Sequence, residues 1–150
     1  MKILELGSGS APLQGAVHHD RIKHSNWIDV AWDLQVLPWP CQNEEWDEVY
    51  AIDVFEHLNT EIIDWLSECH RILKVGGKLT LRLPAWDNEL SYRDPTHKKV
   101  FHHETFDYFD PEKELYKMFG RYYWDNVPLF QVSFVGKENN DLRFELIRRR

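Results

Sequence analysis

A short apolar run that ends in a glycine turn opens the chain. Residues 2–6 read Lys-Ile-Leu-Glu-Leu, and the turn Gly7-Ser8-Gly9-Ser10 follows directly. A strand that runs into glycines is typical of the start of a parallel α/β sheet, in which ligands bind at the carboxyl ends of the strands. Glycine also lets a ligand approach the backbone closely. The opening therefore predicts an α/β fold with a ligand beside Gly7.

Three further apolar runs end at or next to an aspartate. The runs cover residues 16–20, 27–32 and 48–52, and their aspartates are Asp20, Asp33 and Asp53. If these strands are parallel, all three carboxylates lie at the same sheet edge as the Gly7 turn. A carboxylate there can accept hydrogen bonds from ribose hydroxyls, although aspartate is also a common turn residue. Three at one edge favour a nucleoside ligand.

One amphipathic helix is predicted after the fourth strand. Its apolar face consists of residues at helical spacing, namely Leu58, Ile62, Leu66, Cys69 and Leu73. Asn59 or Thr60 can cap its start, and Gly76-Gly77 can end it. Residues 78–83 then predict a fifth strand.

The rest of the chain predicts a long irregular segment and a hairpin. Residues 85–111 are thick with aromatic, His and Asp side chains, and a loop of that length in a compact domain usually has a function. Residues 129–135 and 142–147 predict an antiparallel pair around a polar turn. The fold class predicted is one α/β domain, residues 1–150, with a three-layer, Rossmann-like sheet that is mostly parallel, a C-terminal antiparallel hairpin and few helices.

The composition argues against several classes of protein. The 150 residues contain 18 Lys and Arg against 25 Asp and Glu, a formal charge of −7, which argues against nucleic acid as a partner. No apolar run approaches the roughly 20 residues of a membrane span, and the N-terminus has no signal-peptide pattern. Cys41 and Cys69 form no metal or disulfide pattern, which predicts reduced thiols and a cytoplasmic location.

The glycine turn alone does not identify the ligand. A dinucleotide fingerprint has a third glycine that opens a helix. That position is Pro12 here, and no helical pattern follows it. A nicotinamide-dependent reductase is therefore disfavoured.

Several motifs occur in order along the chain. They are residues 4–9, the Asp33-Leu34 step with residues 37–40, residues 54–58 (Val-Phe-Glu-His-Leu), residues 70–79 (His-Arg-Ile-Leu-Lys-Val-Gly-Gly-Lys-Leu), and residues 92–97 (Tyr-Arg-Asp-Pro-Thr-His) with 105–109. Together they resemble the class I S-adenosylmethionine-dependent methyltransferases, and the later motifs look like a small branch of that superfamily. The resemblance covers roughly residues 2–111 and implies that S-adenosyl-L-methionine is the cofactor.

The resemblance also implies which residues contact the cofactor. It assigns Glu5, Gly7, Ser8 and Gly9 to the methionine and ribose side, Asp20 to the ribose hydroxyls, Asp33 and Leu34 to the adenine, and Asp53, Val54 and His57 to the segment beneath the sulfonium. The helices that often precede and follow the first strand of the family are missing from this chain.

The function implied is methyl transfer to a small-molecule acceptor. Residues 86–109 are expected to wall the acceptor pocket, with His97, Tyr92 and Asp94 as candidate catalytic residues that could remove a proton. No metal site is predicted, because His97, His102 and Glu104 lack metal-ligand spacing. The alternative is a non-catalytic S-adenosylmethionine-binding module or subunit that needs a partner to complete the substrate site. The sequence leaves the oligomeric state open.

Overall fold

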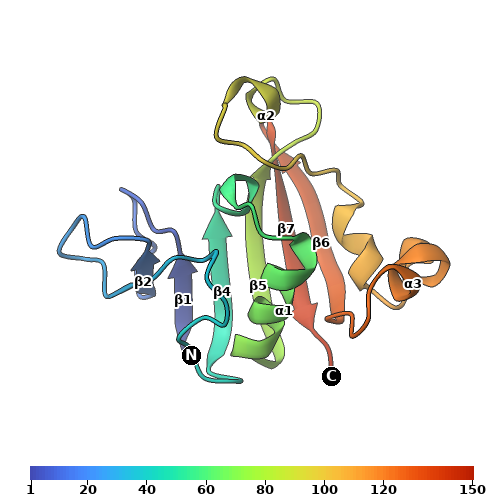
Figure 1. Ribbon diagram of the computed structural model, residues 1–150, viewed down its shortest axis with the longest axis horizontal. Helices are drawn as coiled ribbons and strands as arrows, with labels where there is room; N and C mark the ends of the chain where they lie inside the picture. The colour runs from blue at the N-terminus through green and yellow to red at the C-terminus, as the bar shows by residue number, and fades with distance from the viewer.

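A single seven-stranded sheet organises the computed structural model, which describes residues 1–150 (Figure 1). Its strand order is β3-β2-β1-β4-β5-β7-β6. The strands are β1 (Ile3–Leu6), β2 (Val17–Asp20), β3 (Val30–Ala31), β4 (Trp46–Ile52), β5 (Leu73–Pro84), β6 (Phe130–Glu138) and β7 (Asp141–Arg148). The first five pair in parallel, whereas β7 is antiparallel to both β5 and β6. The predicted Rossmann-like sheet with its C-terminal hairpin is confirmed.

The boundaries of two predicted elements were wrong. The third strand was expected over residues 27–32, but only β3 forms there. The helix α1 (Ile62–Ile72) begins after Glu61, without a side-chain cap, and ends before Gly76-Gly77. It ends early because Leu73 already pairs with Trp46 on β4, so the glycines lie inside β5.

Helical cover is concentrated on one face of the sheet. There α1 lies over β4 and β5, and the short turns η2 (Thr105–Phe109), η3 (Tyr116–Gly120) and α3 (Arg121–Tyr123) lie beside β6 (Figure 1). Alternate residues of β5 point into this layer and are fully buried, namely Leu79, Leu81 and Leu83. Trp65 of α1 stacks on Phe55, with ring centroids 3.8 Å apart.

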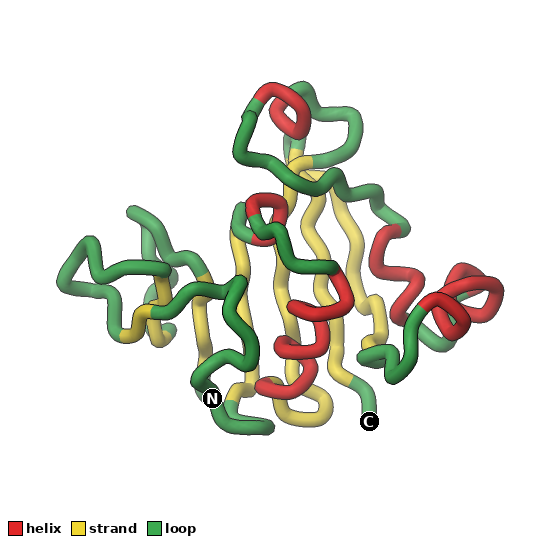
Figure 2. The backbone as a smooth tube through the Cα atoms, viewed as in Figure 1, coloured by secondary structure: helices red, strands yellow, loops and turns green.

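The opposite face of the sheet is polar. Lys78 of β5 pairs with Glu48 of the neighbouring strand β4 at 3.7 Å, and Arg143 pairs with Glu145 of its own strand, β7, at 2.7 Å. The connections from β1 to β4 are loops (Figure 2), and the loop around Leu13 lies against this face. On this face, loops take the place of the helical layer found on the other face. The charged side chains there are paired and can remain in contact with water, so no apolar helix is required to cover them.

Two short helical segments follow the carboxyl ends of β4 and β5. The turn η1 (Phe55–His57) follows β4, and α2 (Leu90–Arg93) follows β5. No helix of this structure has the length and apolar character that a membrane crossing requires.

Candidate functional site

The carboxyl ends of β1, β2, β3 and β4 surround one open cavity of about 290 Å³. The residues that the sequence placed there and that line it are Gly7, Asp20, Asp33, Leu34, Asp53, Val54 and His57. A second cavity of about 480 Å³ shares Gly7 and Asp53 and is lined by the other three, Glu5, Ser8 and Gly9. All ten residues assigned to a cofactor thus lie around one continuous edge, as parallel strands require.

Gly7 occupies a position that only glycine fits. Its φ is +64°, and an added Cβ would lie 2.5 Å from Cγ2 of Val54. Gly9 also has a positive φ of +54°. The chain therefore makes a tight turn in contact with the segment after β4, and a ligand can approach its backbone closely.

The amide groups of this turn are already bonded to β2. The N–H groups of Gly7 and Gly9 donate to His19 Nδ1 at 3.3 Å and to Asp20 Oδ2 at 3.0 Å. The N–H of Ser8 donates to the His19 carbonyl. Glu5 is buried and accepts from the N–H of Leu13 at 2.9 Å. Because these amides are already hydrogen-bonded to β2, they are not free to donate to a ligand. The turn instead contributes a rigid backbone that a ligand can approach closely.

His19 is a residue whose importance the sequence did not reveal. It is buried, accepts from Gly7 at Nδ1, and donates from Nε2 to the Trp32 carbonyl at 2.9 Å. These partners require the neutral ring with its proton on Nε2. Burial lowers the pKa of His19 below its ordinary value of 6.5, against the opposing effects of the Trp32 carbonyl and Asp20.

We expect the free energy of unfolding to fall as the pH drops below 6.5, in part through His19. The unfolded chain takes up this proton first, since the folded pKa is the lower one. His19→Gln should make the free energy of unfolding depend less steeply on pH between pH 7 and pH 5, because the variant lacks the group whose folded-state pKa is lowered. Urea unfolding at both values measures it, and identical slopes for variant and parent would contradict this role.

Asp20 combines turn contacts with access to the cavity. Burial alone would raise the pKa of Asp20, but the N–H groups of Arg21 and Gly9, together with His24, hold it below its ordinary value. The carboxylate is therefore ionised at neutral pH. It remains an acceptor beside the cavity that it lines.

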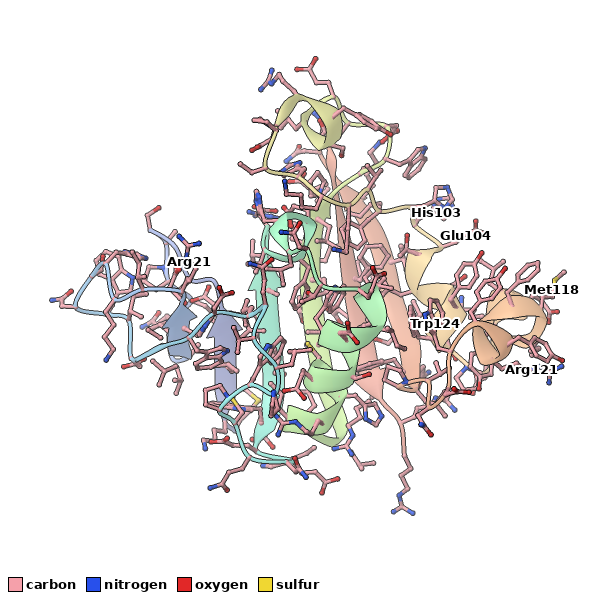
Figure 3. The ribbon with its side chains drawn as sticks, in the orientation of Figure 1. Arg21, His103, Glu104, Met118, Arg121 and Trp124 are labelled. Atoms are coloured by element: carbon pink, nitrogen blue, oxygen red, sulfur yellow. The ribbon has the colours of Figure 1, made fainter.

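Trp32 and Leu34 form an apolar wall next to Asp33. Trp32 packs against His19, with ring centroids 3.9 Å apart and ring planes tilted by 45°, and Leu34 is buried. Asp33 lines the same cavity while Oδ1 accepts from the N–H of Gln35 at 2.9 Å. Asp33 is thus both a turn cap and a cavity carboxylate. Trp32 and Arg21 both line this cavity, although no motif in the sequence marked either residue as a candidate; Arg21 is labelled in Figure 3.

Asp53 lies where the cavities meet. It borders both cavities described above and a third one. Its φ of 56° is a left-handed conformation that costs a non-glycine residue about 1 kcal/mol or more. Arg82 on β5 pairs with both carboxylate oxygens, with Nε 3.2 Å from Oδ1. The ion pair with Arg82 and the left-handed backbone together hold the Asp53 carboxylate at the carboxyl-end edge of the sheet.

The third cavity, of about 300 Å³, adjoins the first through Asp53 and His57. Its remaining lining residues are Glu56, Pro84, Leu90, Asp94, His97 and Asp141. Glu56 is almost completely buried, and this burial raises its pKa to about 8. In the sequence Glu56 stands out only as part of the motif at residues 54–58, and no role was predicted for it.

Two of the three catalytic candidates reach this cavity. Asp94 and His97 line it, with His97 Nε2 3.8 Å from Asp94 Oδ2. Tyr92 does not line it. Its side chain is exposed and its hydroxyl donates to the Trp86 carbonyl, so the structure does not support the catalytic assignment of Tyr92.

The expected aromatic wall is also different. Phe101 and Phe106 are buried in the core instead of lining a pocket. They pack there because residues 101–109 run back over the sheet, where Phe106 meets Phe144 of β7 at 4.7 Å between centroids.

Comparisons with known proteins agree with this architecture. A family model described as a methyltransferase domain matches residues 5–81. No curated protein sequence matches the chain. One similar solved structure comes from the complex between the Haloferax volcanii Trm112 methyltransferase activator and the putative methyltransferase. It has a TM-score of 0.65 and 13% identity over 99% of this chain and 83% of that one.

Two further structures are similar in the same way. The PH0226 protein from Pyrococcus horikoshii has a TM-score of 0.65 and 16% identity over 99% of this chain and 82% of that one. A SAM dependent methyltransferase from Archaeoglobus fulgidus has a TM-score of 0.64 and 15% identity over 98% of this chain and 86% of that one. At these identities the likeness concerns the fold.

Proposed function

Because the chain belongs to the methyltransferase domain family, as an S-adenosylmethionine-dependent enzyme of class I, we propose that it moves a methyl group from that cofactor to a small-molecule acceptor. The observation that carries this proposal is the pair of cavities that share Asp53 and His57. The first cavity, the cofactor cavity, has a lining that suits a nucleoside. The third cavity, the acceptor cavity, contains polar groups that could face an acceptor. Methyl transfer needs two such spaces to meet.

The residues of the first cavity fit the cofactor. Asp20 would accept from the ribose hydroxyls, Asp33 would accept from the adenine amino group, and Trp32 with Leu34 would contact the adenine ring. The Gly7 turn allows close approach of the methionine portion, since a Cβ would fill that space. His57 and Val54 would contact the cofactor from the segment after β4.

The chemistry divides between cofactor and protein. Bound S-adenosylmethionine supplies a methyl group activated by a sulfonium cation. The protein has to align the acceptor with that methyl group and exclude water. Asp53, held by Arg82, would place negative charge near the cation. An acceptor that must lose a proton has His97 and Asp94 within the same cavity.

The acceptor is identified by a product search. The chain is incubated with methyl-labelled S-adenosylmethionine and a metabolite extract, and labelled products are identified by mass spectrometry. A labelled small molecule that requires the chain supports the proposal. Absence of any labelled small molecule, while a labelled protein or RNA appears, would contradict it.

We expect Asp33→Asn to weaken cofactor binding by roughly fivefold, about 1 kcal/mol, because the neutral amide is a poorer acceptor for the adenine amino group. Asparagine can still accept from the N–H of Gln35, so the melting temperature should stay close to that of the parent. Isothermal titration and thermal unfolding give both values. A lowered melting temperature with unchanged affinity would restrict Asp33 to its role as a turn cap.

His97→Ala should leave cofactor affinity nearly intact and reduce methyl transfer at least about tenfold, equivalent to about 1.4 kcal/mol of transition-state stabilisation. His97 lines only the acceptor cavity, which explains the separation of the two effects. Tyr92→Phe serves as the control, because its hydroxyl lies outside the cavities, and its rate should be unchanged. Equal losses of affinity and rate in His97→Ala would contradict the assignment.

One comparison favours a second candidate, in which a partner completes the acceptor site. The similar Haloferax volcanii structure contains an activator protein, and one face of the sheet in this chain has no helical cover. On this alternative the isolated chain binds the cofactor but transfers no methyl group. Activity that appears only when a copurifying protein is added back would favour it over the first candidate.

A further inference from the structure

Three side chains with metal-binding atoms converge in the acceptor cavity. They are Glu56 and His57 of η1 and His97 of the loop after α2. One ligand atom from each lies within 4.8 Å of the other two. No residue spacing in the sequence predicts this group, because the helix α1 and the strand β5 separate His97 from the other two residues along the chain.

The hydrogen bonds around His57 leave one ring nitrogen free to bind a cation. Asp94 can only accept, so the Thr96 hydroxyl donates to Asp94 Oδ1 at 2.7 Å. The Thr96 oxygen must then accept from Nδ1–H of His57, 2.9 Å away. Nε2 of His57 therefore carries a lone pair, and it lies 4.0 Å from Oε1 of Glu56.

That distance suits a shared cation better than a direct contact. Two acceptor atoms 4.0 Å apart form no hydrogen bond. Zinc bonds to nitrogen and carboxylate oxygen are about 2.0–2.2 Å long, so a tetrahedral ion requires these two atoms to lie about 3.4 Å apart. A small rotation of either side chain would bring them to that separation. The chain Asp94–Thr96–His57 has the form in which proteins orient a ligating histidine through its other nitrogen.

The other two residues also have unused polar atoms. Oε2 of Glu56 and Nδ1 of His97 are buried and have no hydrogen-bond partner. Glu56 is 1% exposed. A buried carboxyl without a partner is costly, and a cation bound at this position would satisfy it.

We propose that Glu56, His57 and His97 bind one divalent transition-metal ion, of which Zn²⁺ is the representative. Two imidazoles and one carboxylate form a donor set typical of catalytic zinc and non-haem iron sites, which keep further coordination positions open. Those open positions would face the acceptor cavity, which adjoins the cofactor cavity at Asp53 and His57. Hard cations such as Mg²⁺ prefer all-oxygen ligands and fit less well.

The ion gives the acceptor cavity a chemical preference. An acceptor hydroxyl, thiol or carboxylate could coordinate it beside the methyl donor, and coordination lowers the pKa of a hydroxyl or thiol. In the metal-loaded chain His97 would act by holding the ion instead of by taking a proton. This role in methyl transfer rests on the proposed function, whereas metal binding itself does not.

The test titrates the chelator-treated chain with Zn²⁺ alone, without cofactor, by calorimetry. We expect one ion per chain and a higher melting temperature in its presence. Glu56→Gln and His97→Ala should each weaken binding at least about tenfold, and Thr96→Val, which removes only the orienting hydroxyl, should weaken it about tenfold as well. Co²⁺ absorption should show the same pattern.

A second, exposed group supplies the matched control. His102, His103 and Glu104 also cluster, but Figure 3 shows His103 and Glu104 projecting from the surface. The variant His103→Ala/Glu104→Gln should bind Zn²⁺ as the parent does. No binding by the parent, parent-like affinity in Glu56→Gln, or loss of binding in the control variant would each overturn the proposal.

Two further measurements keep the result decisive. If circular dichroism shows that Glu56→Gln does not fold, unchanged affinity in Thr96→Val overturns the proposal and a tenfold loss supports it. S-adenosylhomocysteine binding is measured separately on metal-free chain. A chain that binds this nucleoside but no Zn²⁺ loses the metal site and keeps the proposed function, so the two failures are distinguishable.

Discussion

Gly7→Ala should destabilise the protein by about 2–4 kcal/mol and abolish measurable cofactor binding. An alanine at φ +64° costs about 1 kcal/mol or more. Its Cβ would also lie 2.5 Å from Val54 Cγ2, so either the turn or the segment after β4 must move. Both carry residues that line the cofactor cavity. Denaturant unfolding and calorimetric titration measure the two effects.

Two variants separate backbone strain from the steric clash. Gly15 has a φ of +84° and no atom within 4 Å of its Cβ position, so Gly15→Ala should cost only about 1 kcal/mol and leave binding intact. Adding Val54→Ala to Gly7→Ala should recover part of the lost stability by removing the clashing methyl groups. If Gly7→Ala behaves like Gly15→Ala, the turn does not define the site.

Asp20→Ala should weaken cofactor binding by about 1.5–3 kcal/mol, a loss of roughly 10- to 150-fold. The substitution removes a charged acceptor for the ribose hydroxyls. It also releases the N–H groups of Gly9 and Arg21, which Asp20 holds at 3.0 and 2.7 Å. Titration with S-adenosylhomocysteine measures the loss without turnover.

Asp29→Ala is the matched control for that variant. Asp29 lies in the loop before β3 and accepts one backbone hydrogen bond, from His18 at 2.8 Å, but it does not line the cavity. Its removal should affect stability and leave affinity unchanged. Similar affinity losses in both variants would show that the loop, rather than the Asp20 carboxylate, determines binding.

The sheet could be predicted from the sequence because its signals are local. The first four strands each end at or shortly before a glycine or an aspartate, and the last two strands alternate in hydropathy around a polar turn. Boundaries were less accessible, because pairing partners decide them. Only Val30 and Ala31 form β3, because only these two residues pair with His19 and Asp20 of β2. The apolar run at residues 27–32 contains no pattern from which this short pairing could be predicted.

The residues of the candidate site also differ in how far the sequence could predict them. Residues next to strand ends, such as Asp20 and Asp53, could be placed because the edge of a parallel sheet gathers them. Glu56 and His19 could not, because their importance comes from burial and from partners distant in sequence. Tyr92, which the sequence also placed in the acceptor pocket, is exposed and does not line the cavity of Asp94 and His97, because a polar residue within a loop can point to solvent.

The most direct test of the account is calorimetric titration of the folded chain with S-adenosylmethionine and S-adenosylhomocysteine, and with a nicotinamide dinucleotide as the comparison. We expect both S-adenosyl compounds to bind with one molecule per chain and Asp20→Ala to weaken the binding of both, and we expect no binding of the dinucleotide. A chain that is folded by circular dichroism and gives no binding heat with either S-adenosyl compound at several temperatures would contradict it.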